Sequence, residues 1–172
     1  MTVSNGSKLY KNGMFGGKFC PMHLGHRYVL EKAMNECETL HVFIFYNTPE
    51  ELKSEMRWFM EPCFRVSQMM RCIRDLLSNG ADCDCAVYTI NSDVYTTETG
   101  ENWYAEANYI KRKAGKIDAV YSSEPSYDPF FKKAYKDAEH IIVDKDRIRY
   151  PVHSSQLRGL SNTDFNLYRW LA

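Results

Sequence analysis

The chain of 172 residues has the length of one domain, and we expect a single domain over residues 1–172. Its 44% hydrophobic and 26% charged residues argue against a disordered or membrane-embedded protein. The 22 lysine and arginine residues balance 22 aspartate and glutamate residues, so the chain lacks the basic field that would hold nucleic acid.

The N-terminal stretch MTVSNGSKLYKNG has no apolar segment of the kind found in secretory signals. The longest strongly apolar run, residues 41–46, is too short to span a bilayer. We therefore expect a cytoplasmic protein without a membrane partner. Its six cysteines are scattered and form no CxxC pair, which favours reduced, packed thiols over a zinc site or a disulfide framework.

The first predicted elements are a strand, a helix and a second strand. Residues 14–19 form a short apolar run that a proline closes. A helix is predicted from about Leu24, because apolar residues recur at i, i+3, i+4 and i+7 from Leu30 to Cys37. The β-branched and aromatic run TLHVFIFY at residues 39–46 then predicts a strand covered on both faces.

The rest of the chain continues the alternation of helices and strands. The predicted elements are a helix at 62–79, a strand at 83–90, a helix at 103–114, a strand at 118–123, a helix at 130–138 and a strand at 140–144. Five strands separated by long connections predict an α/β protein with a Rossmann-like, doubly wound parallel sheet. Such sheets bind ligands at the carboxyl ends of their strands.

The loop after the first strand lies within the stretch GMFGGKFCPMHLGH, residues 13–26. It is not a P-loop, because Lys18 is followed by Phe19 where that motif needs serine or threonine. The dinucleotide pattern G-x-G-x-x-G is absent as well. The stretch therefore belongs to neither of these two phosphate-binding loops.

Two histidines at this strand-to-helix junction offer another kind of anion site. His23 would lie just before the helix and His26 in its first turn, so both rings can face one space above the sheet edge. Gly25 would let a phosphate approach the backbone, and the helix N-terminus adds amide donors. The alternative is that the histidines only cap the helix and the glycines only form turns.

The pattern G-x-F-x-P-x-H-x-G-H resembles the nucleotidyltransferase superfamily that carries an H-x-G-H signature. It is matched at Gly17, Phe19, Pro21, His23, Gly25 and His26. A second signature of that superfamily, I-S-S-T-x-[IL]-R at a helix start, is similar to VHSSQLR at residues 152–158. Val152 and Ser155 are replacements of similar chemistry, whereas His153 stands where a serine is usual. The matching residues are Ser154, Leu157 and Arg158.

Three further places narrow the resemblance to the nicotinamide mononucleotide adenylyltransferases of the bifunctional NAD-biosynthesis regulator type. These are Gly17-Lys18-Phe19, Tyr-Ser-Ser-Glu at 121–124, and Asp144 with Arg147 ahead of the second signature. The similarity runs from about Phe15 to Arg158. The chain has no Walker motif for the kinase domain of those proteins, so we expect the adenylyltransferase module alone.

The resemblance implies that the phosphate of nicotinamide mononucleotide attacks the α-phosphorus of ATP, giving NAD and pyrophosphate, with Mg²⁺ bridging phosphate oxygens and few protein ligands to the metal. The predicted catalytic residues are His23, His26, Lys18 and Arg158. The predicted ATP-binding residues are Gly17, Phe19, Gly25, Ser123, Asp144, Arg147, Ser154 and Ser155. The expected partners are small-molecule nucleotides.

Binding of the acceptor mononucleotide is assigned to Trp103 and Asn47. An indole face would attract an electron-poor pyridine ring, although Trp103 could equally be the first core residue of its helix. Trp58 is an alternative stacking residue. The apolar tail, residues 159–172, would pack back as a short helix or cover a subunit interface. In the second case the protein would be a homo-oligomer.

Other activities fit parts of the pattern. A cytidylyltransferase or a pantetheine-phosphate adenylyltransferase would keep the fold, but the segment from Arg149 onward matches the R-T-x-G-I-S-T-T element of cytidylyltransferases poorly. A class I aminoacyl-tRNA synthetase is disfavoured by the short chain and the missing K-M-S-K-S. A nucleotide sensor without turnover is the alternative of a different class, because His153 departs from the second signature.

Overall fold

The computed structural model describes residues 7–47, 61–159 and 169–172. Its centre is a parallel sheet in the order β3-β2-β1-β6-β7. The strands are β1 (Tyr10–Gly17), β2 (Cys37–Tyr46), β3 (Asp84–Asn91), β6 (Ala119–Ser122) and β7 (Glu139–Ile142). The predicted α/β, doubly wound parallel sheet is confirmed, and the strand order reverses between β1 and β6.

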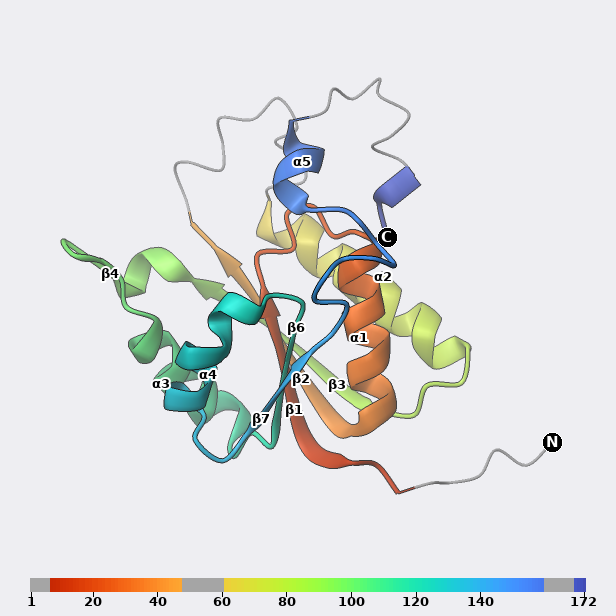
Figure 1. Ribbon diagram of the computed structural model, residues 1–172, viewed down its shortest axis with the longest axis horizontal. Helices are drawn as coiled ribbons and strands as arrows, with labels where there is room; N and C mark the ends of the chain where they lie inside the picture. Colours follow the sequence, from red (N-terminus) through yellow and green to blue (C-terminus); the bar gives the residue numbers. More distant parts are fainter. Residues whose placement is uncertain (1–6, 48–60, 160–168) are drawn as a thin grey trace.

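Helices cover both faces of this sheet (Figure 1). On one face lie α1 (Leu24–Glu36) and α2 (Pro62–Ser78), and on the other lie α3 (Trp103–Ala114) and α4 (Asp128–Ala134). Because successive strand residues point to opposite faces, Phe15 packs beneath α1 and α2 whereas Met14 packs beneath α3 and α4. The burial of the strands on both faces explains why their sequences are almost continuously apolar.

Several boundaries differ from the predictions. Strand β1 begins at Tyr10 because the polar residues YKN pair with β2, which hydrophobic patterning does not reveal. It ends at Gly17 instead of residue 19, since Phe19 adopts a left-handed φ of 48°. Cys37 opens β2 instead of closing the first helix, and α4 ends at Ala134, before the predicted residue 138.

Two small elements complete the described fold. A hairpin of β4 (Thr96–Thr97) and β5 (Gly100–Glu101) precedes α3, and it was not predicted. The helix α5 (Ser154–Arg158) begins within the second signature, as predicted. None of the helices in the described ranges is long and apolar enough to cross a membrane. The six cysteines are all free thiols, and four of them are buried.

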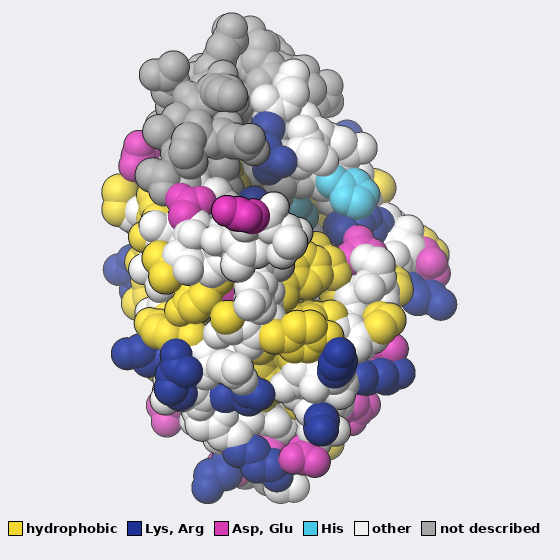
Figure 2. Space-filling view, turned by 90° about the vertical axis from the view of Figure 1, so that its left-hand side faces the viewer, with side chains coloured by type: hydrophobic (Ala, Val, Ile, Leu, Met, Phe, Trp, Pro, Cys, Tyr) yellow, Lys and Arg dark blue, Asp and Glu magenta, His cyan; other side chains and the backbone are white. Residues whose placement is uncertain are grey.

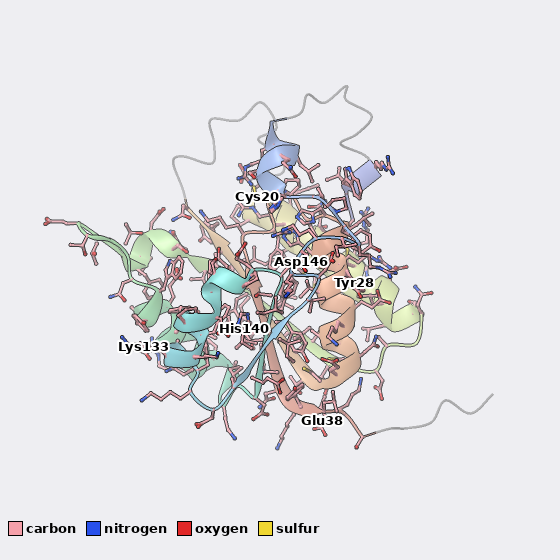
Figure 3. The ribbon with its side chains drawn as sticks, in the orientation of Figure 1. Cys20, Tyr28, Glu38, Lys133, His140 and Asp146 are labelled. Atoms are coloured by element: carbon pink, nitrogen blue, oxygen red, sulfur yellow. The ribbon has the colours of Figure 1, made fainter. Side chains whose placement is uncertain are left out.

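His140 ties α4 to the edge of the sheet. Its Nε2 lies 2.7 Å from the Ser122 Oγ at the end of β6, and its Nδ1 lies 3.0 Å from the Asp128 Oδ1 at the start of α4. Lys132 and His140 lower the pKa of Asp128. The ring of His140 is only 2% exposed and lies next to α4 (Figure 3), so this chain of bonds holds α4 on the sheet, as expected of a structural histidine.

Candidate active site

The two signature histidines form a stacked pair at the carboxyl end of β1. His23 is the N-cap of α1, with extended backbone angles, and His26 occupies the first helical turn. Their ring centroids are 3.7 Å apart with an interplanar angle of 22°, and the His23 backbone N–H donates to His26 Nδ1 at 3.3 Å. The structure thus brings both rings together, as the sequence predicts.

Gly25 makes this stacking possible. A Cβ at Gly25 would lie 3.1 Å from the Cε1 and Nδ1 atoms of His23, tighter than most real Cβ contacts. A side chain at this position would force the His23 ring to shift by a few tenths of an ångström. Gly25 therefore leaves room for the observed position of this ring, in addition to any close approach of a ligand.

Both imidazoles are held in the neutral form. Burial, and then the charges of Arg147 and His153, lowers the pKa of His23 from 6.5 to about 3. Burial, then His23 and Arg147, lowers the pKa of His26 well below its usual value. At neutral pH the pair therefore presents two uncharged rings inside a positive surrounding, which suits a polyanionic ligand.

This arrangement predicts a loss of stability in acid. The unfolded chain takes up the His23 proton near pH 6.5, before the folded chain does, so the free energy of unfolding falls as the pH drops below that value. At about pH 5.5 the loss from His23 alone is about 1.4 kcal/mol. Urea unfolding at about pH 8 and about pH 5.5 measures it. His23→Asn keeps an N-cap residue and should lose this part of the pH dependence; an unchanged dependence would contradict the assignment.

The second signature packs directly on the first. Ser154 Oγ donates to the Pro21 carbonyl at 3.1 Å, and Arg158 Nη1 donates to the Cys20 carbonyl. Cys20 lies just below α5 in Figure 3. Val152 and Leu157 are buried together on the inner side of this segment. Two signatures more than a hundred positions apart therefore form one site, at the end of the sheet where ligands of doubly wound proteins bind.

His153 is the N-cap of α5, the same place that His23 holds in α1. Its backbone N–H donates to Gln156 Oε1 at 2.9 Å, and the residue is exposed. Burial and Arg147 lower the pKa of His153, whereas Glu124 raises it. The charge of His153 also lowers the pKa of His23, so the residue that departs from the signature acts electrostatically on the stacked pair.

The loop before α5 is organised by Asp144. Its Oδ1 accepts the backbone N–H groups of Ile148 at 3.0 Å and Arg149 at 3.2 Å, and its Oδ2 accepts that of Tyr150 at 3.1 Å. Arg147 donates through Nη1 to the Val152 carbonyl at 3.2 Å. Asp144 thus shapes the loop that carries Arg147 toward the histidines, and direct contact of either side chain with ATP stays a prediction.

A cavity of about 160 Å³ opens beside this site, between the end of β1 and the helices α3 and α4. Its wall includes Gly17, Lys18, Phe45, Trp103, Glu106 and Phe130. Trp103 is 39% exposed and meets Tyr127 and Phe130 edge-on, with centroids 5.7 and 5.4 Å away. Figure 2 shows hydrophobic side chains gathered at the centre of this face. Trp103 is therefore an exposed wall of the cavity, and it does not belong to the buried core that its helix covers.

The remaining predicted site residues differ in burial and in whether they line the cavity. Ser123 is half-buried just after β6, and Ser155 is exposed on α5. Asn47 follows β2 and donates to Asp93 Oδ1 at 3.3 Å, but it is not among the residues that line the cavity. Trp58 and most of the 159–172 tail lie outside the described residues.

Arg65 is part of the site, although the predictions assigned no role to it. This guanidinium in α2 is completely buried, and its Nη1 donates to the Lys18 carbonyl at 3.2 Å and the Phe45 carbonyl at 3.0 Å. It therefore joins the loop after β1 to the end of β2. Its sequence signal was weak, since an arginine near a helix start is usually a surface residue.

The sheet order and the helices on both of its faces define a Rossmann-like fold, with the histidine pair after the first strand and the helix α5 packed above it. Residues 18–67 match the family model of the citrate lyase ligase C-terminal domain.

Similar solved structures include a bifunctional NMN adenylyltransferase/ADP ribose pyrophosphatase from Francisella tularensis, with a TM-score of 0.63 and 17% identity over 87% of this chain and 41% of that one. NadR protein in complex with NAD and AMP-PNP gives a TM-score of 0.57 and 17% identity over 88% of this chain and 43% of that one. Nicotinic acid mononucleotide adenylyltransferase from Plasmodium falciparum, complexed with NaAD, gives a TM-score of 0.56 and 15% identity over 94% of this chain and 90% of that one. The chain thus spans less than half the length of the first two proteins, and these low identities show a shared fold.

Proposed function

We propose that this chain is an adenylyltransferase that joins the AMP moiety of ATP to nicotinamide mononucleotide and releases pyrophosphate. The observation that carries the proposal is the stacked pair of His23 and His26, packed against the second signature and next to an aromatic cavity. The fold shared with adenylyltransferases for pyridine mononucleotides supports it. Gly17-Lys18-Phe19 favours the NAD-biosynthesis regulator type among them.

The reaction needs alignment and charge stabilisation and no covalent intermediate. A phosphate oxygen of the mononucleotide forms a bond to the α-phosphorus of ATP. The bond from that phosphorus to the bridging oxygen breaks, and its electron pair leaves with pyrophosphate. Negative charge builds up on the bridging and equatorial oxygens, so hydrogen-bond donors fixed at those positions lower the barrier.

The chain offers such donors around the histidines. The first amides of α1, a helix of 13 residues, point toward this space, and the imidazoles of His23 and His26 can donate from their ring nitrogens. Lys18 is exposed at the rim of the cavity, where an ammonium can reach a phosphate. We assign Ser154, Ser155 and Arg158 to the outer phosphates, because α5 lies against the same loop.

Magnesium would enter this site bound to the phosphates of ATP. Among residues 7–47, 61–159 and 169–172, no group of three acidic, histidine or cysteine side chains is placed to hold a metal ion, and both oxygens of Asp144 already accept backbone amides. Mg²⁺ keeps several waters and is commonly held through substrate phosphates. When bound, it would neutralise phosphate charge, and the side chains described above would orient the nucleotide.

Pyrophosphate release by the purified protein tests the proposal. ATP or CTP is offered with magnesium and with nicotinamide mononucleotide, nicotinate mononucleotide, pantetheine phosphate or glycerol phosphate. Release only with ATP and a pyridine mononucleotide is the expected result. The match to citrate lyase ligase favours, as second candidate, a nucleotidyltransferase for another phosphate acceptor. Turnover with another pair would support that candidate, and ATP binding without any turnover would indicate a sensor.

Trp103 provides a test of the acceptor site alone. Trp103→Ala is expected to raise the KM for the mononucleotide about tenfold, because stacking on the indole face is lost. The KM for ATP should stay within about twofold, since the phosphate site is left intact. Initial rates with each substrate varied in turn measure both constants. Tyr104→Ala is the matched control, because Tyr104 is the next residue but does not line this cavity. Equal KM values for Trp103→Ala and the wild type would place the acceptor elsewhere.

A further inference from the structure

A chain of hydrogen bonds runs from α4 through a buried histidine to the bend after β6 (residues 122–124). The Asp128 Oδ1 lies 3.0 Å from Nδ1 of His140, and Nε2 of His140 lies 2.7 Å from the Ser122 Oγ. The Ser122 hydroxyl oxygen in turn accepts the backbone N–H of Glu124 at 3.3 Å. The chain of bonds therefore reaches past the sheet into the bend that follows it.

Serine, histidine and aspartate in this order are also the groups that activate a nucleophilic serine in hydrolases. That role needs a hydroxyl that a substrate can reach. Ser122 is 7% exposed, the side chain of His140 is 2% exposed, and neither residue lines the cavity between β1, α3 and α4. The burial favours instead a role in which Ser122 holds the backbone of the bend.

The bonds hold the bend in either protonation state of the histidine ring. In the neutral ring, Nδ1 donates to Asp128 and Nε2 accepts the hydroxyl proton of Ser122, whose oxygen accepts the Glu124 N–H. In the protonated ring both nitrogens donate, and the Ser122 hydroxyl can donate to the Glu124 carbonyl, 3.4 Å away. The bend is thus fastened by a ring that is itself fixed by Asp128.

The bend after β6 lies at the edge of the candidate site. Through its carbonyl, Ser122 accepts the backbone N–H of Val143 at 2.7 Å, where β7 passes into the loop before α5. Ser123, which is predicted to bind ATP, lies between the two bonded residues of the bend. One buried residue therefore connects this bend with the loop that leads to the second signature.

The bend also interacts electrostatically with that loop. Hydrogen bonds from Ser126 lower the pKa of Glu124 most, and the charges of Arg147 and His153 lower it further. The same two residues lower the pKa of His23. Glu124 therefore belongs to the cluster of charges around the stacked histidines, and a displaced bend would change the surroundings of a bound phosphate.

We propose that His140 is a positioning residue of the nucleotide site, which fixes the bend after β6 through Ser122. This inference rests on the proposed function and extends it to a buried residue outside the two signatures. The two bonds of the ring have separable effects. Loss of the Nε2 bond to Ser122 should weaken ATP binding, whereas loss of the Nδ1 bond to Asp128 should chiefly weaken the attachment of α4.

Two substitutions of His140 separate these bonds. The amide of His140→Gln can take the place of Nε2 and keep the bond to Ser122, whereas the amide of His140→Asn can take the place of Nδ1 and keep the bond to Asp128. The KM for ATP should rise about tenfold in His140→Asn and stay within about twofold of the wild type in His140→Gln. The KM for the mononucleotide should stay within about twofold in both variants, because the acceptor cavity is unchanged.

Thermal unfolding of the same variants separates positioning from stability. Each variant loses one of the two bonds, so a purely structural role predicts similar losses of stability and equal KM values for ATP. Tyr10→Phe is the matched control, because it removes a hydrogen bond of 2.6 Å to Glu139, the residue before His140, without touching the bend. Its KM for ATP should equal that of the wild type.

The outcomes separate this inference from the proposed function. Ser122→Ala should raise the KM for ATP as His140→Asn does, and it takes the place of that variant if His140→Asn does not fold. Equal KM values for ATP in the two His140 variants, or an unchanged KM in Ser122→Ala, would overturn the positioning role while turnover stands.

Without turnover for any substrate pair, the proposed function fails, and calorimetric titration with ATP and magnesium decides the inference. Weaker binding in His140→Asn and Ser122→Ala than in His140→Gln and the wild type supports it. Equal affinities, or a wild type that does not bind ATP, contradict it.

Discussion

His26→Ala is expected to lower kcat for pyrophosphate release about 10³-fold, the loss found when one fixed donor to a developing negative charge is removed. The structure gives the reason in three contacts. The His26 ring stacks on His23, its Nδ1 accepts the backbone N–H of His23, and the edge of the ring meets Phe19. With Nδ1 occupied in this way, the neutral ring carries its proton on Nε2, which is the nitrogen left to donate to a phosphate oxygen.

The measurement is steady-state pyrophosphate release at saturating ATP and mononucleotide. Thermal unfolding of His26→Ala checks that the variant is folded at the assay temperature, because it loses the ring contacts with His23 and Phe19. His41→Gln is the matched control, since His41 lies within β2 and is expected to be structural. A kcat for His26→Ala within about tenfold of the wild type would contradict a role for this ring in the reaction.

Arg65→Met should lower the free energy of unfolding by about 3 kcal/mol. The guanidinium is completely buried, and one of its nitrogens bonds to the carbonyls of Lys18 and Phe45. A methionine fills a similar volume but leaves both carbonyls without this donor. Since these carbonyls belong to the loop after β1 and to the end of β2, the variant should also loosen the entrance to the cavity.

Urea unfolding monitored by circular dichroism measures the effect on stability. Arg74→Met is the control, because Arg74 is exposed on the same helix, and its stability should change by no more than about 0.5 kcal/mol. Equal stabilities of the two variants would show that Arg65 does not hold the loop to the sheet. A stable Arg65→Met protein with a raised KM for the mononucleotide would still agree with a positioning role at the cavity.

Most of the fold was predictable because strands buried on both faces and amphipathic helices leave strong patterns. The run from Thr39 to Tyr46 and the helix from Pro62 onward were predicted within about two residues. The first strand was harder, since Tyr10 and Asn12 belong to it through pairing with Cys37 and Thr39 and not through hydrophobicity. The β4–β5 hairpin was missed because two-residue strands have no periodicity to detect.

The candidate site, too, was predictable only where residues close together in the sequence form it. The histidine pair and its glycine were predictable, because one loop and one helix start place them. The role of Arg65 depends on which strand end lies opposite α2, and no short sequence pattern records that. Asp144 was predicted as an ATP contact from resemblance, whereas the structure shows its carboxylate bound to the backbone of the following loop.

The most direct test of the central claim follows the α-phosphorus itself. The purified protein is incubated with magnesium, nicotinamide mononucleotide and ATP radiolabelled at the α-phosphorus, and the products are separated by chromatography. The account predicts that the label moves into a dinucleotide that co-elutes with NAD, while the released pyrophosphate is unlabelled, and that His26→Ala abolishes this transfer. Label that stays in ATP, or that appears in another product, would contradict the account.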